Sequence, residues 1–263
     1  MLNQIKIYFL LFIIYSMIGW VMEVMCSLQR LKKFVNRGFL IGPYCPIYGC
    51  GAILITLLLN KYLNDPITLF IMAILLCGVL EYLTSYFMEK IFHLRWWDYS
   101  QKKFNINGRV CLDTIIPFGI LGMLIMYILN PFFLEKLNLL NQTALNIVFY
   151  IVIAIYVTDN IISLITMFGI RKTTASVSRE NREDNTEEIT KKVREILLGR
   201  PKAFTQKRLI NAYPKLETIR IKVKEKIEQT KEEIDKRKEM FDEKIEQTKE
   251  EISKRKKIKD KRK

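Results

Sequence analysis

The stretch IYFLLFIIYSMIGWVMEVM, residues 7–25, contains one charged side chain, Glu23, among residues that are otherwise mostly large and apolar. A helix needs about 20 such residues to cross the roughly 30 Å hydrocarbon core of a bilayer. Apolar segments at 39–59, 67–87, 114–129 and 145–168 bring the expected number of spans to five. No small-residue cleavage site follows the first segment, so we expect a retained span and not a signal peptide. The predicted fold class is an all-α, polytopic membrane helix bundle of about five transmembrane helices.

Charge divides the chain of 263 residues into two predicted parts. Residues 1–170 carry a net charge of +4 and residues 171–263 carry +11, which together give +15. We therefore expect a transmembrane bundle over 1–170 and a basic cytoplasmic tail over 171–263. The loops after the first and third spans are basic, whereas those after the second and fourth are nearly neutral. The positive-inside rule then places the N-terminus outside and the C-terminus inside, in a multi-pass cell membrane protein.

Three acidic residues fall within the predicted spans: Glu23, Glu81 and Asp159. Ionisable groups in hydrocarbon are costly and usually face protein or water. Glu23 and Glu81 lie near the basic side, where they either pair with flanking arginines as structural clamps or handle substrate or protons. Asp159 lies closest to the midplane, and Tyr156, Asn160, Ser163 and Thr166 form a polar stripe with it on the fifth span. We hold a role in substrate or proton handling and a structural role both open for Asp159.

The second apolar segment contains the sequence GFLIGPYCPIYGCG, residues 38–51, with prolines at 43 and 46. One interpretation is a helix that begins near Pro46 and ends at Leu59, preceded by non-helical backbone at membrane depth. The positive end of such a helix suits an anionic group. The other interpretation is a continuous helix with a proline kink.

The loop HLRWWDYSQKKFNINGRVCLD, residues 93–113, is richer in polar and aromatic residues than a simple connection requires. Trp96, Trp97 and Tyr99 fit an interfacial aromatic belt. The asparagines and Gly108 that precede Arg109 predict tight turns and therefore a folded loop. The candidate docking or gating residues are Arg37, Arg95, Trp96, Trp97, Asp98, Tyr99, Asn105, Gly108 and Arg109.

Three runs in the first 170 residues, NRGFLIGPYCPIYGCG, EYLTSYFMEKIFHLRWWDYS and FNINGRVCL, resemble the ABC-transporter permease family of the CmpB type (type IV). RLINAYPKL, residues 208–216, resembles a segment at that family's cytoplasmic end. The resemblance implies a membrane permease but supplies no catalytic or binding residues. The positions that match its motifs are Glu23, Arg37, Gly38, Gly42, Pro43, Tyr48, Gly49, Glu81, Arg95, Trp96, Trp97, Asp98, Tyr99, Asn105, Gly108 and Arg109.

The tail repeats EKIEQTKEEIDKRK (225–238) as EKIEQTKEEISKRK (243–256), which predicts a long charged helix with a thin apolar stripe, too narrow for a firm coiled-coil assignment. Residues 174–187 are expected to form a flexible linker, followed by a short helix over 188–198. The basic C-terminal residues, KRKKIKDKRK, suit anionic lipid or remain solvated. Nucleic acid is disfavoured because no aromatic residues interleave with the charges.

The sequence contains no G-x-x-x-x-G-K-[ST] motif, so any ATPase that serves this chain is expected to be a separate subunit. His93 is the only histidine and the five cysteines form no C-x-x-C pair, so we expect no metal, no cofactor and no catalytic residue. The predicted function is a permease-like component of a transport system, which works as a homo-oligomer or with partners. The alternative is a non-transporting membrane scaffold or sensor that binds partners through its cytoplasmic loop and tail.

Overall fold

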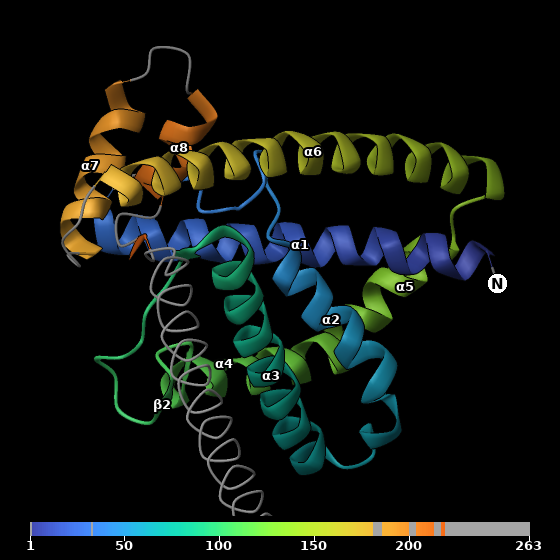
Figure 1. The fold of residues 1–263 in the computed structure, drawn as a ribbon. Helices are drawn as coiled ribbons and strands as arrows, with labels where there is room; N and C mark the ends of the chain where they lie inside the picture. The colour runs from blue at the N-terminus through green and yellow to red at the C-terminus, as the bar shows by residue number, and fades with distance from the viewer. Residues whose placement is uncertain (1, 33, 181–185, 200–203, 213–216, 219–263) are drawn as a thin grey trace, which may run out of the picture. The chain divides into compact units, whose positions relative to one another are not determined.

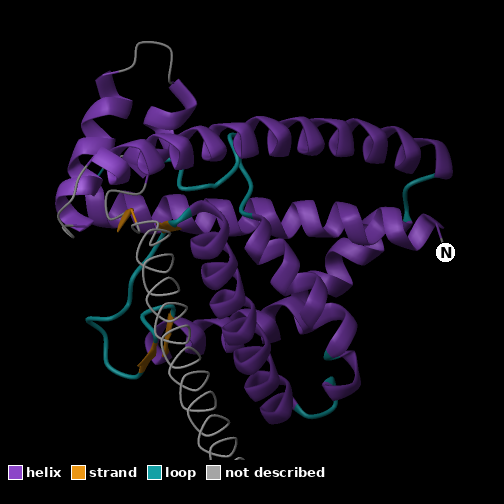
Figure 2. Ribbon diagram, in the orientation of Figure 1, coloured by secondary structure: helices purple, strands orange, loops and turns teal. Residues whose placement is uncertain are grey.

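The computed structural model describes residues 2–32, 34–180, 186–199, 204–212 and 217–218, and these residues are mostly helical (Figures 1 and 2). The chain divides into two compact units, residues 1–220 and 221–263. The repeat-bearing helix and the basic C-terminal end predicted above lie outside the described residues.

All of the described helices and strands belong to the first unit. The helices are α1 (Leu2–Leu31), α2 (Pro46–Leu58), η1 (Asn60–Tyr62), α3 (Pro66–Phe92), α4 (Leu112–Leu124), the π-helical η2 (Ile125–Leu129), α5 (Asn130–Asn138), α6 (Gln142–Glu180), α7 (Thr186–Gly199) and α8 (Phe204–Ala212). The strands are β1 (Leu94–Arg95), β2 (Asn105–Ile106), β3 (Val110–Cys111) and β4 (Glu217–Thr218). Two antiparallel pairs result, β1 with β4 and β2 with β3.

The all-α membrane bundle predicted from the sequence is confirmed. In the described part of the chain, four helical stretches are long and apolar enough to cross a membrane: α1, α3, the run from α4 to α5, and α6. The remaining predicted span, α2, has only 13 residues and is about 20 Å long, too short to cross alone. The inside and outside orientation stays a prediction.

Local sequence signals explain where the helices begin and bend. Pro46 and Pro66 occupy the first turns of α2 and α3, where a missing N–H costs little. The side chain of Asp65 caps α3 by accepting a hydrogen bond from the backbone N–H of Thr68 at 3.1 Å. The π-helical η2 precedes Pro131, which has no N–H to offer the turn before it.

Helices α1 and α6 lie side by side and run parallel (Figure 1). Side-chain contacts join their first turns, where the Lys6 ammonium donates to Asn146 at 2.6 Å. Both helices therefore start at the same end of the bundle. Helix α3 runs one way along the bundle and the α4 to α5 run comes back, so together they end where α3 began. The segment that contains α2 must therefore lead from the end of α1 back to the end of the bundle at which α1 and α6 start.

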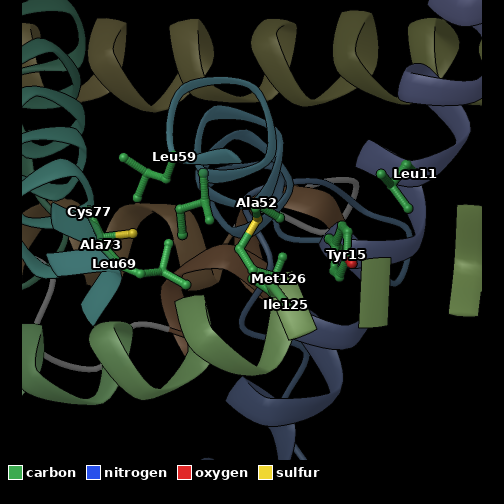
Figure 3. Packing of buried hydrophobic residues seen from close by; sticks show 10 residues of the cluster. Leu11, Tyr15, Ala52, Leu59, Leu69, Ala73, Cys77, Ile125 and Met126 are labelled. Atoms are coloured by element: carbon green, nitrogen blue, oxygen red, sulfur yellow. The ribbon is translucent and has the colours of Figure 1, made fainter. Parts of the chain in front are cut away.

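The bundle core is an apolar cluster where α1, α2, α3 and η2 meet (Figure 3). Small residues allow close packing, because a Cβ on Gly122 would lie 2.6 Å from that of Ala73. The buried members of the cluster are Leu11, Tyr15, Ala52, Ile55, Leu59, Leu69, Ala73, Cys77, Ile125 and Met126.

The region beyond residue 170 packs onto the bundle more closely than a flexible tail would. Helix α6 continues to Glu180 and α7 begins at Thr186, so the linker predicted over 174–187 is wrong for residues 174–180 and 186–187. The short helix predicted over 188–198 is confirmed as α7. The predicted division at residue 170 concerns membrane location and stays a prediction.

Candidate functional site

The segment between α1 and α2, residues 36–45, is non-helical and is called the strap below. At its far end the backbone N–H of Cys45 donates to the carbonyl of Ser16 at 2.9 Å. Ser16 lies 15 residues before Leu31, the end of α1, and therefore about 22 Å back along that helix. The helix beginning at Pro46 is thus the interpretation that the structure supports, and the continuous kinked helix is wrong.

Asp159 from α6 holds the middle of the strap. Its buried carboxylate accepts hydrogen bonds from the backbone N–H groups of Ile41 at 2.9 Å and Gly42 at 2.7 Å. The hydroxyl of Ser163, one turn further along α6, donates to the same carboxylate at 3.0 Å. The two backbone donors lie four and five residues before Pro46, so the anionic group expected at the start of α2 stays a prediction.

Asn36 closes the first turn of the strap. Its side-chain oxygen accepts from the indole N–H of Trp20 at 2.8 Å and from the backbone N–H of Gly38 at 3.1 Å. Its amide nitrogen donates to the carbonyl of Ile41 at 2.8 Å. These bonds satisfy backbone groups that could not remain unpaired at membrane depth.

Arg208 from α8 holds the strap from the other side. Its guanidinium donates to the carbonyls of Gly38 and Phe39, each at 3.2 Å. A hydrogen bond of 3.1 Å between the hydroxyls of Thr166 and Thr205 fixes α8 against α6 nearby. The strap is therefore held jointly by a membrane helix and by a helix that the sequence assigned to the tail.

Replacing Arg208 with alanine should lower the free energy of unfolding by about 1–3 kcal/mol, since two carbonyls lose a charged donor. Lysine at this position keeps the charge but cannot reach both carbonyls with a planar fork, so R208K should recover only part of the loss. The apparent melting temperature of the purified protein measures both. Lys207→Ala is the matched control, and an equal fall in that variant would argue against a specific contact.

The predicted acids Glu23 and Glu81 have different partners. Glu23 accepts from the hydroxyl of Tyr48 at 2.8 Å and pairs with Arg37 at 3.5 Å, so the predicted clamp is observed here. Glu81 is buried and accepts from the hydroxyl of Tyr99 at 3.3 Å. Two phenols, one from α2 and one from the loop, therefore face the two carboxylates.

The arginines expected to pair with Glu81 instead meet Glu89, which lies closer to the end of α3. Arg95 lies 3.3 Å and Arg109 lies 2.9 Å from the Glu89 carboxylate. A clamp between these arginines and Glu81 is thus wrong. Glu89 is two turns further along α3, where the returning loop brings both guanidinium groups within reach.

The loop after α3 is folded, as its turn residues predicted. The carboxylate of Asp98 accepts from the backbone N–H of Ser100 at 3.1 Å, and the backbone N–H of Tyr99 donates to the carbonyl of Gly108 at 2.7 Å. Gly108 has φ of 67°, and a Cβ there would collide with Asp98. The backbone N–H of Gly108 donates to the side chain of Asn105 at 3.0 Å. Partial burial acts to raise the pKa of Asp98, but the hydrogen bonds from Ser100 outweigh it and hold that pKa below its usual range.

Of the two tryptophans of the loop, Trp96 is buried and Trp97 is half-buried. Trp96 is only 6% exposed, and Trp97 donates its indole N–H to the carbonyl of Arg109 at 2.9 Å. The expectation that Trp96 belongs to an interfacial belt is therefore wrong, because its ring fills a core between the loop and the tail helices. That cluster contains Phe92, Leu94, Trp96, Met167, Ile170, Val177, Val193, Leu197 and Leu209.

Ser163 of the predicted stripe on α6 joins Asp159, whereas Tyr156 and Asn160 have other partners. The ring of Tyr156 packs against those of Phe9, Phe12 and Tyr44, with centroids 5.6–6.0 Å apart. The side chain of Asn160 donates to the carbonyl of Tyr156 at 2.7 Å, a bond within its own helix.

Some residues that hold the site were not singled out from the sequence. Arg208 lies in residues 208–216, a run that resembles the family, so the resemblance pointed to it. Asn36 and Glu89 also lie in runs that resemble the family, but nothing else in the sequence marked them. Asn130 is buried after η2, where it accepts from Tyr15 at 2.7 Å and donates to Thr56 at 2.9 Å. An isolated asparagine beside a proline predicts a turn from sequence, and only the packing of three helices shows its true role.

A comparison with known protein families finds one match, to the family described as "Putative ABC-transporter type IV" (CmpB), over residues 10–164. No curated protein and no solved structure matches the chain. The matched residues contain α2, α3, the strap, the folded loop and Asp159, and they account for more than half of the chain. The match and the apolar helices together identify the chain as a multi-pass membrane protein that belongs to this ABC-transporter type IV family.

Proposed function

We propose that the chain is the permease-like subunit of a transport system and that a separate polypeptide supplies the ATPase. The observation that carries this proposal is the strap, a non-helical segment deep in the bundle that ends where α2 begins. Interrupted helices of this kind form substrate pathways in several transporter folds, because their backbone groups face protein or a cavity instead of lipid. The family match supports the same conclusion.

The strap also suggests how a partner would act on the bundle. Arg208 lies on α8, outside the four apolar stretches, and contacts the strap carbonyls directly. A partner that displaces α8 would alter those contacts and therefore the position of the backbone that Asp159 holds. In this proposal α7 and α8 transmit the state of the ATPase to the strap.

The surface of α7 and α8 suits a protein partner. Phe204, the first residue of α8, is 77% exposed, and Ile196 and Leu198 of α7 are also exposed. Exposed aromatic residues of this kind are frequent anchors of protein interfaces. The same surface also serves the alternative function, a scaffold or sensor, so the identity of the partner separates the two proposals.

Purification of the full-length chain from its native membrane in mild detergent should co-purify an ATPase subunit and ATPase activity. Phe204→Asp should lower the recovered ATPase by about tenfold or more, since loss of an aromatic anchor costs about 2 kcal/mol. Leu139→Asp is the matched control, because that leucine is also highly exposed and follows α5 at the other end of α6. Recovery of protein partners without any ATPase would contradict the permease and favour the scaffold.

A further inference from the structure

The tip of the folded loop, residues 101–107, exposes large apolar side chains next to positive charge. Phe104 is 78% and Ile106 is 60% exposed. Lys102 and Lys103 precede them and are also exposed; residues 101–107 include no acidic side chain, and Lys102 lies 3.7 Å from the exposed carboxylate of Asp113. Exposed apolar side chains beside lysines are typical of a segment that lies at a membrane surface, and less typical of a solvated loop.

The exposure of Phe104 is built into the loop. Its φ is +52°, an uncommon conformation for a bulky residue. The side chain of Asn105 donates to the carbonyl of Lys102 at 2.7 Å and accepts from Gly108, which ties both sides of the tip together. The turn thus keeps the Phe104 ring pointing away from the protein.

The depth of the tip follows from its contacts with α3. The side chain of Asn107 donates to the hydroxyl of Tyr82 at 3.0 Å, and the Arg109 guanidinium lies 5.6 Å from the ring centroids of both Tyr82 and Tyr86. Tyr82 lies ten residues before the end of α3 at Phe92, which is about 15 Å along the helix axis. The loop therefore turns back along the helix instead of standing above it.

The length of α3 relates this level to the bilayer. Its 27 residues span about 40 Å, so it exceeds the roughly 30 Å hydrocarbon core by only about 10 Å in total. Tyr82 then lies within the membrane boundary even if all of the excess is at this end, and a tilt of α3 shortens the excess further. From that level the long side chains of Lys102 and Lys103 can reach the headgroup layer.

The helices on either side of the loop carry further exposed apolar side chains. Leu83 and Phe87 on α3, and Leu112, Ile116 and Ile120 on α4, are exposed apolar residues of membrane-spanning stretches. The tip continues this surface. A soluble partner would have to reach Phe104 at a level where these neighbours contact acyl chains.

We propose that Phe104 and Ile106 insert into the boundary between headgroups and acyl chains, and that Lys102 and Lys103 bind the phosphates of anionic lipids there. The loop after α3 is then a membrane-anchoring hairpin, with its buried half held by Trp96 and its exposed half held by lipid.

Tryptophan at the tip tests the proposal in the full-length protein in lipid nanodiscs of phosphatidylcholine and phosphatidylglycerol. F104W and I106W each add a tryptophan to the three native ones. The fluorescence of the added tryptophan should be quenched by lipids brominated on their acyl chains and should be quenched little by acrylamide. Phe204→Trp is the matched control, expected to respond to acrylamide alone. Both tip side chains are exposed, so the variants should elute and melt like the unaltered protein.

Two outcomes would overturn the proposal. Quenching of the added emission by acrylamide and not by brominated lipid would place the tip in water, where a soluble protein is the fitting partner. Equal quenching whether bromine is carried by phosphatidylglycerol or by phosphatidylcholine would remove the preference for anionic lipid. Stronger quenching by brominated phosphatidylglycerol, weakened in the K102Q/K103Q double variant, is the expected result.

Discussion

Replacing Asp159 with alanine is expected to lower the free energy of unfolding by about 2–6 kcal/mol, because the half-buried N–H groups of Ile41 and Gly42 each lose their acceptor at about 1–3 kcal/mol. Asparagine keeps one acceptor oxygen but points an N–H₂ group at the second donor, so D159N should recover less than half of the loss. The apparent melting temperature of the purified protein measures the fall, and amide hydrogen exchange at residues 41 and 42 should accelerate in both variants.

Thr158→Ala is the matched control for Asp159, since Thr158 is the adjacent residue of α6, is exposed, and its hydroxyl donates to the carbonyl of Ala154 in its own helix. It should change the melting temperature little. If D159A melted and exchanged like T158A, the carboxylate would not be what holds the strap. A D159N protein that stays folded but loses function would then restore the substrate or proton role.

Replacing Trp96 with alanine should cost about 3–5 kcal/mol, the usual range for removing a large buried aromatic side chain. The loss should extend beyond the loop, because the same cluster includes Val193 of α7 and Leu209 of α8. Hydrogen exchange of α7 and α8 should therefore rise together with that of the loop, and the melting temperature should fall.

Phe104→Ala gives the contrast within the same loop, since that ring is exposed where Trp96 is buried. In detergent it should leave the melting temperature nearly unchanged. Equal effects of W96A and F104A would contradict the division of the loop into a buried half and a lipid-facing half. Trp96→Phe, which retains most of the packing, should fall between the two.

The sequence predicted the helices and the folding of the loop because those features depend on local patterns. The lengths of the apolar segments predicted the long helices, and Pro46 predicted the start of α2. Gly108 and the asparagines before it predicted the turns of the loop. The partners of the charged groups could not be read in the same way. Arg109 pairs with Glu89 and not with Glu81. Which of the two acids it reaches depends on the path of the loop after α3 as it returns along that helix.

Asp159 illustrates the same limit from the other direction. Its depth and its polar neighbours on α6 were evident, and they suggested a site for substrate or protons. Only Ser163 of that stripe donates to it, and two of its partners are backbone N–H groups 117 and 118 residues earlier in the chain, which no side-chain pattern marks. The functional assignment of Asp159 therefore stays a prediction, while its structural contacts are observed.

The contacts of the strap also set an order for biogenesis. Gly42 emerges from the ribosome 117 residues before the carboxylate that binds it, and at about 5–20 residues per second this interval lasts about 6–23 s. Arg208, which binds the carbonyls of Gly38 and Phe39, follows later still. Until then the insertion machinery or water must solvate these backbone groups, so the segment from residue 36 to α2 can settle at its final depth only after α6 has been inserted. Chains truncated before Asp159 should consequently remain bound to the insertion machinery or be degraded.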